Sequence, residues 1–288
     1  MPKPPLVLDA HGKHASAVRF TRDGKHLVSG GLDPALRVWS VPGFKSEHVL
    51  EGHQKGVHAL AFRADGKRLV TSSNDPSVKL WSFPEGECLL TLEKQVLGAL
   101  GPDGSHLVTL SAKGELALWD GDTGAQRRAI EPLDKRHLAL GFAGSGLFLF
   151  VGGTGPIHRL ALPDCTLDGV HTGHQIGVVC LEASPNPAIL ASTGLDGTLR
   201  FWTVIGGAEV TSVPLDGAGA YQLAFAPDGR SVAVSVDHAV LWLGAPDGEL
   251  RQRFEVPVKG VQGVSISPDG RWLAAAASDG RVRVWELT

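Results

Sequence analysis

The residues of this 288-residue chain that could do chemistry are its histidines, cysteines, serines and aspartates. The motif HGKH (11–14) places two histidines three apart, which suits a metal only if both rings converge. Cys88, Cys165 and Cys180 are too few to staple a secreted fold and lack Cys-x-x-Cys spacing. Asp-Gly pairs recur, but the D-x-D-x-D-G run of a calcium loop is absent. We therefore predict no metal site and no cofactor.

Serine, histidine and aspartate together could also form a hydrolase triad. The sequence has no G-x-S-x-G elbow to raise a serine toward a substrate. The glycine-rich stretch GGTGPI (152–157) lacks the third glycine of a dinucleotide fingerprint, and GK[ST] never occurs. We therefore predict no catalytic residues.

Composition narrows the class of protein further. With 27 Lys and Arg against 30 Asp and Glu, the net charge is −3, which argues against nucleic-acid binding through the overall field. No apolar run approaches the ~18 residues needed to span a bilayer, and the first residues lack a signal-peptide apolar region. We expect a cytoplasmic protein without membrane contact. The scarcity of Asn, Tyr and Met suggests a GC-rich bacterial source.

Tryptophan spacing reveals an internal repeat of about 41 residues. Six of the seven tryptophans end a matching segment: Trp39, Trp81, Trp119, Trp202, Trp242 and Trp285. The one double interval has Leu160 at its midpoint, so seven units fill the chain. Upstream of each Trp, a turn pair is followed by alternating apolar residues, which is typical of a strand with one face on a core.

Tight turns divide each unit into four short strands. Asp-Gly turns recur before the second strand, as in RDGK (22–25), ADGK (64–67) and PDGR (268–271). Asp-Gly flanked by apolar alternation is a strong hairpin signal because glycine accepts a positive φ at little cost. No helical periodicity appears. The sequence thus predicts an all-β fold built from seven four-stranded units.

These repeats resemble the WD-repeat family of β-propellers, whose units carry a Gly-His pair and a Trp ending the third strand. Gly52-His53 and Gly173-His174 match the pair, and Ala10-His11 matches with the glycine replaced. Each of these histidines precedes its tryptophan by 28 residues. The resemblance covers the whole chain and implies a seven-bladed propeller of four-stranded antiparallel blades.

The resemblance also implies a hydrogen-bonded chain of His, Ser or Thr, Asp and Trp within each complete repeat. Carried over by position, the three structural tetrads are His11, Ser29, Asp33 and Trp39; His53, Thr71, Asp75 and Trp81; and His174, Ser192, Asp196 and Trp202. Because this arrangement occurs three times and ends on an indole, which can only donate, a structural role is favoured over hydrolysis.

The repeats are unequal. Repeats three, four, six and seven lack the His, and repeat four also lacks the Trp and the turn Asp. Repeat six is one residue short between Asp237 and Trp242. Such blades must depend more on apolar packing and on their neighbours. We expect repeats three and four to be the most mobile part of the ring.

The ends of the sequence predict how the ring closes. The chain stops three residues after Trp285, whereas PLVLDAH (5–11) aligns with EHVLEGH (47–53), a fourth strand leading into a histidine. Residues 5–8 should therefore form the outer strand of the last blade and remove an open edge. The single domain, 1–288, then divides into blades at about 11–52, 53–94, 95–132, 133–172, 173–214, 215–256 and 257–288, the last completed by 5–8.

The inner strands of a propeller line its channel, so residues where they begin should form a rim on the narrow face. By matched position these residues are Ser16, His58, Val96, Leu138, Val179, Tyr221 and Gln262. Residues just before the turn Asp, or their counterparts, add Leu32, Asn74, Ala112, Gly153, Leu195, Val236 and Ser278. Seven of these fourteen are large and apolar, and together they would form a patch typical of an interaction site. Tyr221 is the best anchor.

Two functions follow from this reading. The first is a non-enzymatic scaffold, itself monomeric, that docks a protein or peptide on the narrow face, which the resemblance associates with partner binding. The alternative is a propeller enzyme of hydrolase or lactonase type with a metal site at the channel mouth. The predicted rim carries one His and no carboxylate, so the scaffold is favoured.

Overall fold

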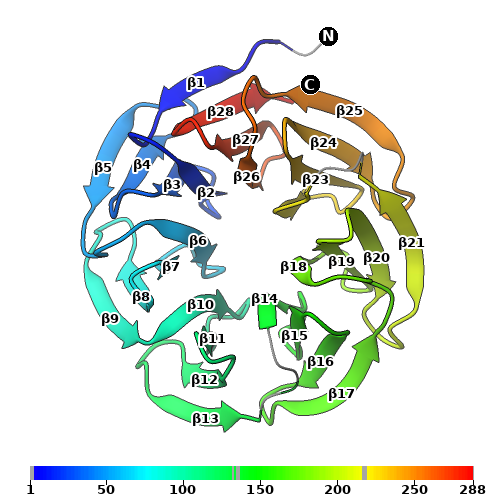
Figure 1. Ribbon diagram of the computed structural model, residues 1–288. Helices are drawn as coiled ribbons and strands as arrows, with labels where there is room; N and C mark the ends of the chain where they lie inside the picture. Colours follow the sequence, from blue (N-terminus) through cyan, green and yellow to red (C-terminus); the bar gives the residue numbers. More distant parts are fainter. Residues whose placement is uncertain (1–2, 132, 134–136, 216–218, 288) are drawn as a thin grey trace.

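The computed structural model describes residues 3–131, 133, 137–215 and 219–287, and the side chains of His137 and Leu138 lie outside that description. Its strands form seven separate four-stranded antiparallel sheets arranged as blades around a central opening (Figure 1). Blades one to three contain β2 (Ala15–Phe20), β3 (His26–Gly31), β4 (Leu36–Ser40) and β5 (Ser46–Leu50); β6 (Val57–Phe62), β7 (Arg68–Ser73), β8 (Ser77–Ser82) and β9 (Cys88–Glu93); and β10 (Gln95–Leu100), β11 (His106–Ser111), β12 (Leu116–Asp120) and β13 (Gln126–Ile130).

The other four blades follow the same order from the channel outward. They contain β14 (His137–Phe142), β15 (Phe148–Gly153), β16 (Ile157–Ala161) and β17 (Thr166–His171); β18 (Val178–Ala183), β19 (Ile189–Gly194), β20 (Thr198–Thr203) and β21 (Glu209–Pro214); β22 (Leu223–Phe225), β23 (Ser231–Val236), β24 (Ala239–Gly244) and β25 (Leu250–Glu255); and β26 (Val261–Ile266), β27 (Trp272–Ala277), β28 (Arg281–Glu286) and β1 (Leu6–Asp9). The predicted all-β, seven-bladed propeller is confirmed.

The N-terminal strand completes the last blade, as predicted. β1 pairs antiparallel with β28, and its residues run one position further than the predicted 5–8. Leu8 and Ala10 are buried against blade one, so this strand belongs to the core as well as to the sheet edge. Figure 1 shows β1 lying along the outside of β28 near both chain ends.

The apolar core lies between blades rather than in one central mass. The described buried residues form clusters that each join two neighbouring blades, for example Val38 and Leu50 of blade one with Leu69 and Trp81 of blade two. Each blade is therefore covered on both faces by its two neighbours, which explains the continuous apolar runs in the middle strands of the blades. We call the face at which the inner strands begin the front face, which corresponds to the predicted narrow face, and the other the back face.

Candidate functional site

The first set of seven predicted rim residues lies where the inner strands begin, and six of these seven sit on β-bulges. In blade one the pairing of β2 with β3 skips Ser16, and the pairing of β6 with β7 skips His58 in the same way. The equivalent skipped residues in the other blades are Val96, Leu138, Val179 and Gln262. A β-bulge redirects a side chain out of the regular alternation of a strand. At the five of these positions whose side chains are described, the backbone therefore turns the side chain away from the two faces of the sheet.

A central channel of about 900 Å³ passes between the inner strands. Five rim residues contribute to its lining: Ser16, His58, Val179, Tyr221 and Gln262. Leu138 belongs to β14, but its side chain lies outside the described part of the chain.

The apolar patch predicted on the front face is smaller than expected. Leu32, Leu195 and Tyr221 are exposed, at 50%, 55% and 39%. Val96 is half-buried against the core between blades three and four, and Val179 is half-buried in the channel wall. Of the seven large apolar residues predicted to be exposed together, Leu32, Leu195 and Tyr221 are the ones exposed among those whose side chains are described.

Val236 was predicted at the rim, and this is wrong. It is buried in the core between blades five and six. The missing residue in repeat six explains the error, because the strands continue to the Val236–Ala239 pair and leave only Asp237 and His238 in the turn. Leu32 and Leu195, in contrast, lie just beyond the ends of β3 and β19.

Ile176 was missed by the sequence reasoning. It is 56% exposed in the loop that precedes β18, next to Gly177, whose carbonyl accepts a hydrogen bond from the Leu195 N–H. Blades five and six therefore present three exposed apolar side chains on the front face, Ile176, Leu195 and Tyr221. The available signal was an apolar residue in a polar, glycine-containing loop (HQIG), which the repeat alignment did not weigh.

Tyr221 is held in place by a partner that the sequence did not indicate. Its hydroxyl donates a 2.8 Å hydrogen bond to Asp237 Oδ1, and Lys259 Nζ lies 3.5 Å from Asp237 Oδ2. The hydrogen bond to Asp237, followed by partial burial, raises the pKa of Tyr221. A fixed aromatic ring loses little freedom on binding, which suits an anchor.

Polar rim residues connect neighbouring blades. Ser16 Oγ donates to the Val57 carbonyl at 3.1 Å, and His58 Nε2 lies 2.9 Å from the Val96 carbonyl oxygen, which places the ring proton there. Ser278 Oγ donates to the Lys259 carbonyl within its own blade. Asn74 is exposed, and Gln262 is half-buried. These contacts give Ser16 and His58 a structural task beside any role in binding.

The three tetrads have the geometry of continuous hydrogen-bonded chains. In blade two, His53 Nδ1 lies 2.9 Å from Asp75 Oδ2, its Nε2 lies 2.7 Å from Thr71 Oγ1, and the Trp81 indole donates to the same hydroxyl at 2.9 Å. The corresponding chains run through His11, Ser29, Asp33 and Trp39, and through His174, Ser192, Asp196 and Trp202.

Burial decides the charge state of these histidines. Desolvation lowers the pKa of His53 and of His174, although hydrogen bonds and charge from Asp75 and Asp196 oppose it. Burial alone would raise the pKa of Asp75, but hydrogen bonds from Ser77, the Gln54 N–H and His53 outweigh it and lower that pKa. Each serine or threonine hydroxyl is already engaged by an imidazole and an indole, so the chains are built to hold a blade together.

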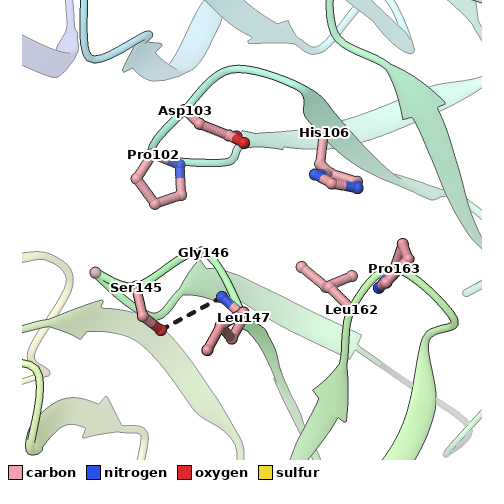
Figure 2. Close-up of a pocket in the computed structure, with 9 residues that line it drawn as sticks. Pro102, Asp103, His106, Ser145, Gly146, Leu147, Leu162 and Pro163 are labelled. Atoms are coloured by element: carbon pink, nitrogen blue, oxygen red, sulfur yellow. Dashed lines mark hydrogen bonds between the residues drawn. The ribbon is translucent and has the colours of Figure 1, made fainter.

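A second pocket, of about 500 Å³, lies on the back face between blades three and four (Figure 2). Its titratable lining residues, Asp103 and His106, both bond to the hydroxyl of Ser105, at 2.8 and 2.6 Å. The rest of the wall is mainly turn backbone with Pro102 and Leu147. In the described residues, no group of three His, Cys, Asp or Glu side chains could hold a metal ion. That same part of the chain contains no helix long and apolar enough to cross a bilayer.

Comparison with known proteins identifies the class. The family model "WD domain, G-beta repeat" matches residues 2–40, 44–82, 165–203 and 248–286, more than half of the chain. The chain belongs to the WD-repeat family. The matched segments contain the three tetrad repeats and the last repeat, which ends at Trp285.

Individual relatives are similar over part of their length. The target of rapamycin complex subunit wat1 of Schizosaccharomyces pombe is 34% identical over 101 residues, covering 34% of this chain and 32% of that protein. Centriole proteome protein 16 of Chlamydomonas reinhardtii is 32% identical over 117 residues, covering 40% and 5%. The chain thus matches a third or less of the length of these relatives. Both are eukaryotic, so they do not support the expected bacterial source.

A solved structure supports the fold at full length. The β-propeller domain of Cps50 (Swd1) from Myceliophteria thermophila superimposes with a TM-score of 0.86 at 19% identity, covering 96% of this chain and 97% of that one. At this identity the likeness concerns the fold alone.

Proposed function

We propose that this protein is a non-enzymatic scaffold that docks a protein or peptide partner on its front, narrow face, at blades five and six. The observation that carries the proposal is the group of exposed apolar side chains there: Ile176, Leu195 and Tyr221. Apolar residues gathered beside a channel mouth are typical of an interaction site, and an aromatic anchor can dominate such an interface. Membership in the WD-repeat family supports a protein-interaction scaffold in general.

The position of the site supports binding of a chain segment rather than a small substrate. Ile176 and Leu195 belong to two loops of blade five, and Tyr221 precedes β22 of blade six, so the side chains span two blades.

The three cysteines are free thiols, which supports the proposed cytoplasmic location.

The test is to replace the exposed side chains and measure partner capture. We expect the double variant Tyr221→Asp, Leu195→Asp to lose the partner that the unmodified protein captures from cells of its source organism, because two buried charges oppose an apolar contact. Captured proteins would be quantified by mass spectrometry.

The matched control is Ile205→Asp. Ile205 is 65% exposed in the turn between β20 and β21 on the back face, and the change adds one negative charge, as each of the two front-face substitutions does. We expect this variant to capture the partner as well as the unmodified protein. If the double variant retains the same proteins at the same level while melting normally, the proposed face is wrong.

A further inference from the structure

The back end of the channel carries a cationic pair that the docking proposal does not use. At each of two matched positions, all seven blades contribute one residue to the channel wall. The outer ring is Arg22, Ala64, Pro102, Gly144, Pro185, Pro227 and Pro268. The ring next to it is Arg19, Ala61, Ala99, Gly141, Glu182, Ala224 and Ser265. Two arginines and one glutamate therefore stand among otherwise uncharged residues.

Arg19 and Glu182 face each other across the opening. Arg19 lies on β2 of blade one and Glu182 on β18 of blade five, and Figure 1 shows these strands on opposite sides of the channel. Arg19 Nη1 and Glu182 Oε2 are 3.6 Å apart, so the pair is an ion contact beyond hydrogen-bond range. Glu182 Oε1 also accepts the Phe225 N–H at 3.3 Å, which holds the carboxylate to blade six.

The guanidinium groups have nearly all of their donors free. Arg22 forms no hydrogen bond or ion pair with any residue that the structure describes, and Arg19 has only the contact with Glu182. Elsewhere on the back face, Arg63 shows the usual alternative, because Asp65 and Asp122 both pair with it. Arg22 has no such carboxylate, although it sits where the surroundings partly desolvate it.

The charges of this site are unbalanced. The channel wall partly desolvates the otherwise exposed Arg22, and this together with the neighbouring charge of Arg19 lowers the pKa of Arg22, with Glu182 opposing them. The other titratable side chains that line the channel are His58 and Tyr221, which lie toward the front face, and Cys180, whose thiol pKa is raised by burial. Two positive groups and one negative group leave a net positive charge, and an anion on the axis would relieve the repulsion between the arginines.

We propose that Arg19 and Arg22 form an oxyanion site at the back mouth of the channel and that its ligand is a small compound bearing a phosphate group. Each guanidinium presents a planar fork of N–H donors that matches two oxygens of one anion. A carboxylate has only two oxygens and is satisfied by one fork, whereas a terminal phosphate offers three. Glu182 limits the affinity because its carboxylate competes for Arg19. This proposal is independent of docking on the front face.

The test is titration calorimetry of the full chain with inorganic pyrophosphate at low ionic strength. We expect one saturable site per chain. Arg22→Gln should weaken the binding at least about tenfold, which is typical of losing a charge-assisted contact. Glu182→Gln should strengthen it, because the amide keeps the acceptor for the Phe225 N–H and removes the competing charge. Arg22 is exposed and forms no hydrogen bond or ion pair with a described residue, so Arg22→Gln should leave the fold intact, which an unchanged Tm would verify.

Arg230→Gln is the matched control. Arg230 lies in the equivalent back-face turn of blade six, outside the channel lining, so its loss changes the net charge equally and should leave affinity unchanged. Citrate and a hexaglutamate peptide are the comparison ligands, and both should bind more weakly than pyrophosphate. Three results would overturn the proposal: no saturable pyrophosphate binding, equal loss in the Arg22 and Arg230 variants, or tighter binding of either carboxylate ligand.

Discussion

Blades two and four are held together in different ways. Blade two contains its own chain of hydrogen bonds, from Asp75 through His53 and Thr71 to Trp81. All four residues come from within one repeat. The chain fixes the loop before β6, the second strand and the third strand relative to one another.

Blade four has Leu160 in place of the tryptophan and contains an arginine network instead. The buried Arg159 donates through Nε to Asp168 Oδ2 at 2.8 Å and through Nη1 to the Val204 carbonyl of blade five. Its guanidinium also lies 5.0 Å from the centre of the Phe148 ring. His171, the last residue of β17, packs edge-on against Trp202, the tryptophan of blade five.

The difference teaches that a closed ring can stabilise a weak blade from outside. Blade two brings its own polar framework, whereas blade four fastens its polar side chains to blade five. Blade three is intermediate, because the Trp119 indole donates to Thr109 Oγ1 at 2.8 Å without a histidine. Neighbour contacts of this kind are what hold repeat proteins together.

The largest effect is expected from removing residues 1–10, since blade seven takes its outer strand from the other end of the sequence. The deletion exposes the edge of β28 and removes buried Leu8 and Ala10. We expect a loss of about 4 kcal/mol or more, or roughly 10 °C in Tm. Thermal unfolding followed by circular dichroism measures it. A truncated protein that melts like the full chain would show that the closure contributes nothing.

A smaller effect should distinguish complete from partial tetrads. Thr71→Val leaves both the His53 ring nitrogen and the Trp81 N–H without a partner and should cost about 3 kcal/mol. Thr109→Val strands only the Trp119 N–H and should cost about half as much. Chemical denaturation gives both values. Equal costs would mean that the histidine adds nothing to the chain.

Arg159→Met should destabilise blade four by about 2 kcal/mol, because it strands the Asp168 carboxylate and the Val204 carbonyl. Amide exchange should quicken in blades four and five together. The control Arg128→Met removes an exposed pair with Asp164 and should change little.

The unmodified protein should exchange its amide hydrogens faster in blades three and four than in blades one and two. The opposite order would contradict the expected mobility.

The smallest effect concerns pH. Burial lowers the pKa of His11, His53 and His174 in the folded state. Below about pH 6.5 the unfolded chain therefore binds more protons than the folded chain, and acidification favours unfolding. Their contribution to stability is complete above that pH and declines as pH falls. Asp75 and Asp196, with lowered pKa values, add a further loss below about pH 4. We expect Tm to fall by a few degrees from pH 7.5 to 5, and by less in His174→Gln. A Tm that rises on acidification would mean that these histidines are protonated in the folded protein.

The sequence was sufficient for the features that recur from one repeat to the next, but not for a contact found in a single repeat, such as Tyr221 with Asp237. The tetrads could be predicted because the resemblance to the WD-repeat family implies them at matching positions, and the closure because PLVLDAH matches a fourth strand. Contacts between repeats could not be predicted in this way. The Arg19–Glu182 pair and the Arg159–Val204 bond depend on which blades face each other once the ring has closed.

Side-chain exposure was also beyond the repeat pattern. Val236 and Leu195 occupy matched positions, yet the two-residue turn of blade six keeps Val236 in the strand and buries it. Ile176 was missed because its position was not among the matched sets: the loop HQIG (174–177) repeats HQKG (53–56), where the same position is Lys55. One residue of turn length decides whether such a position faces solvent or core.

Amide exchange of the protein alone and with its purified partner tests the proposed docking most directly. Docking at blades five and six predicts slower exchange in residues 174–177, 194–197 and 219–223 when the partner is bound, with the back-face turn at Ile205 unchanged. Unchanged exchange in all three front-face segments, with new protection at the back-face turns, would contradict it.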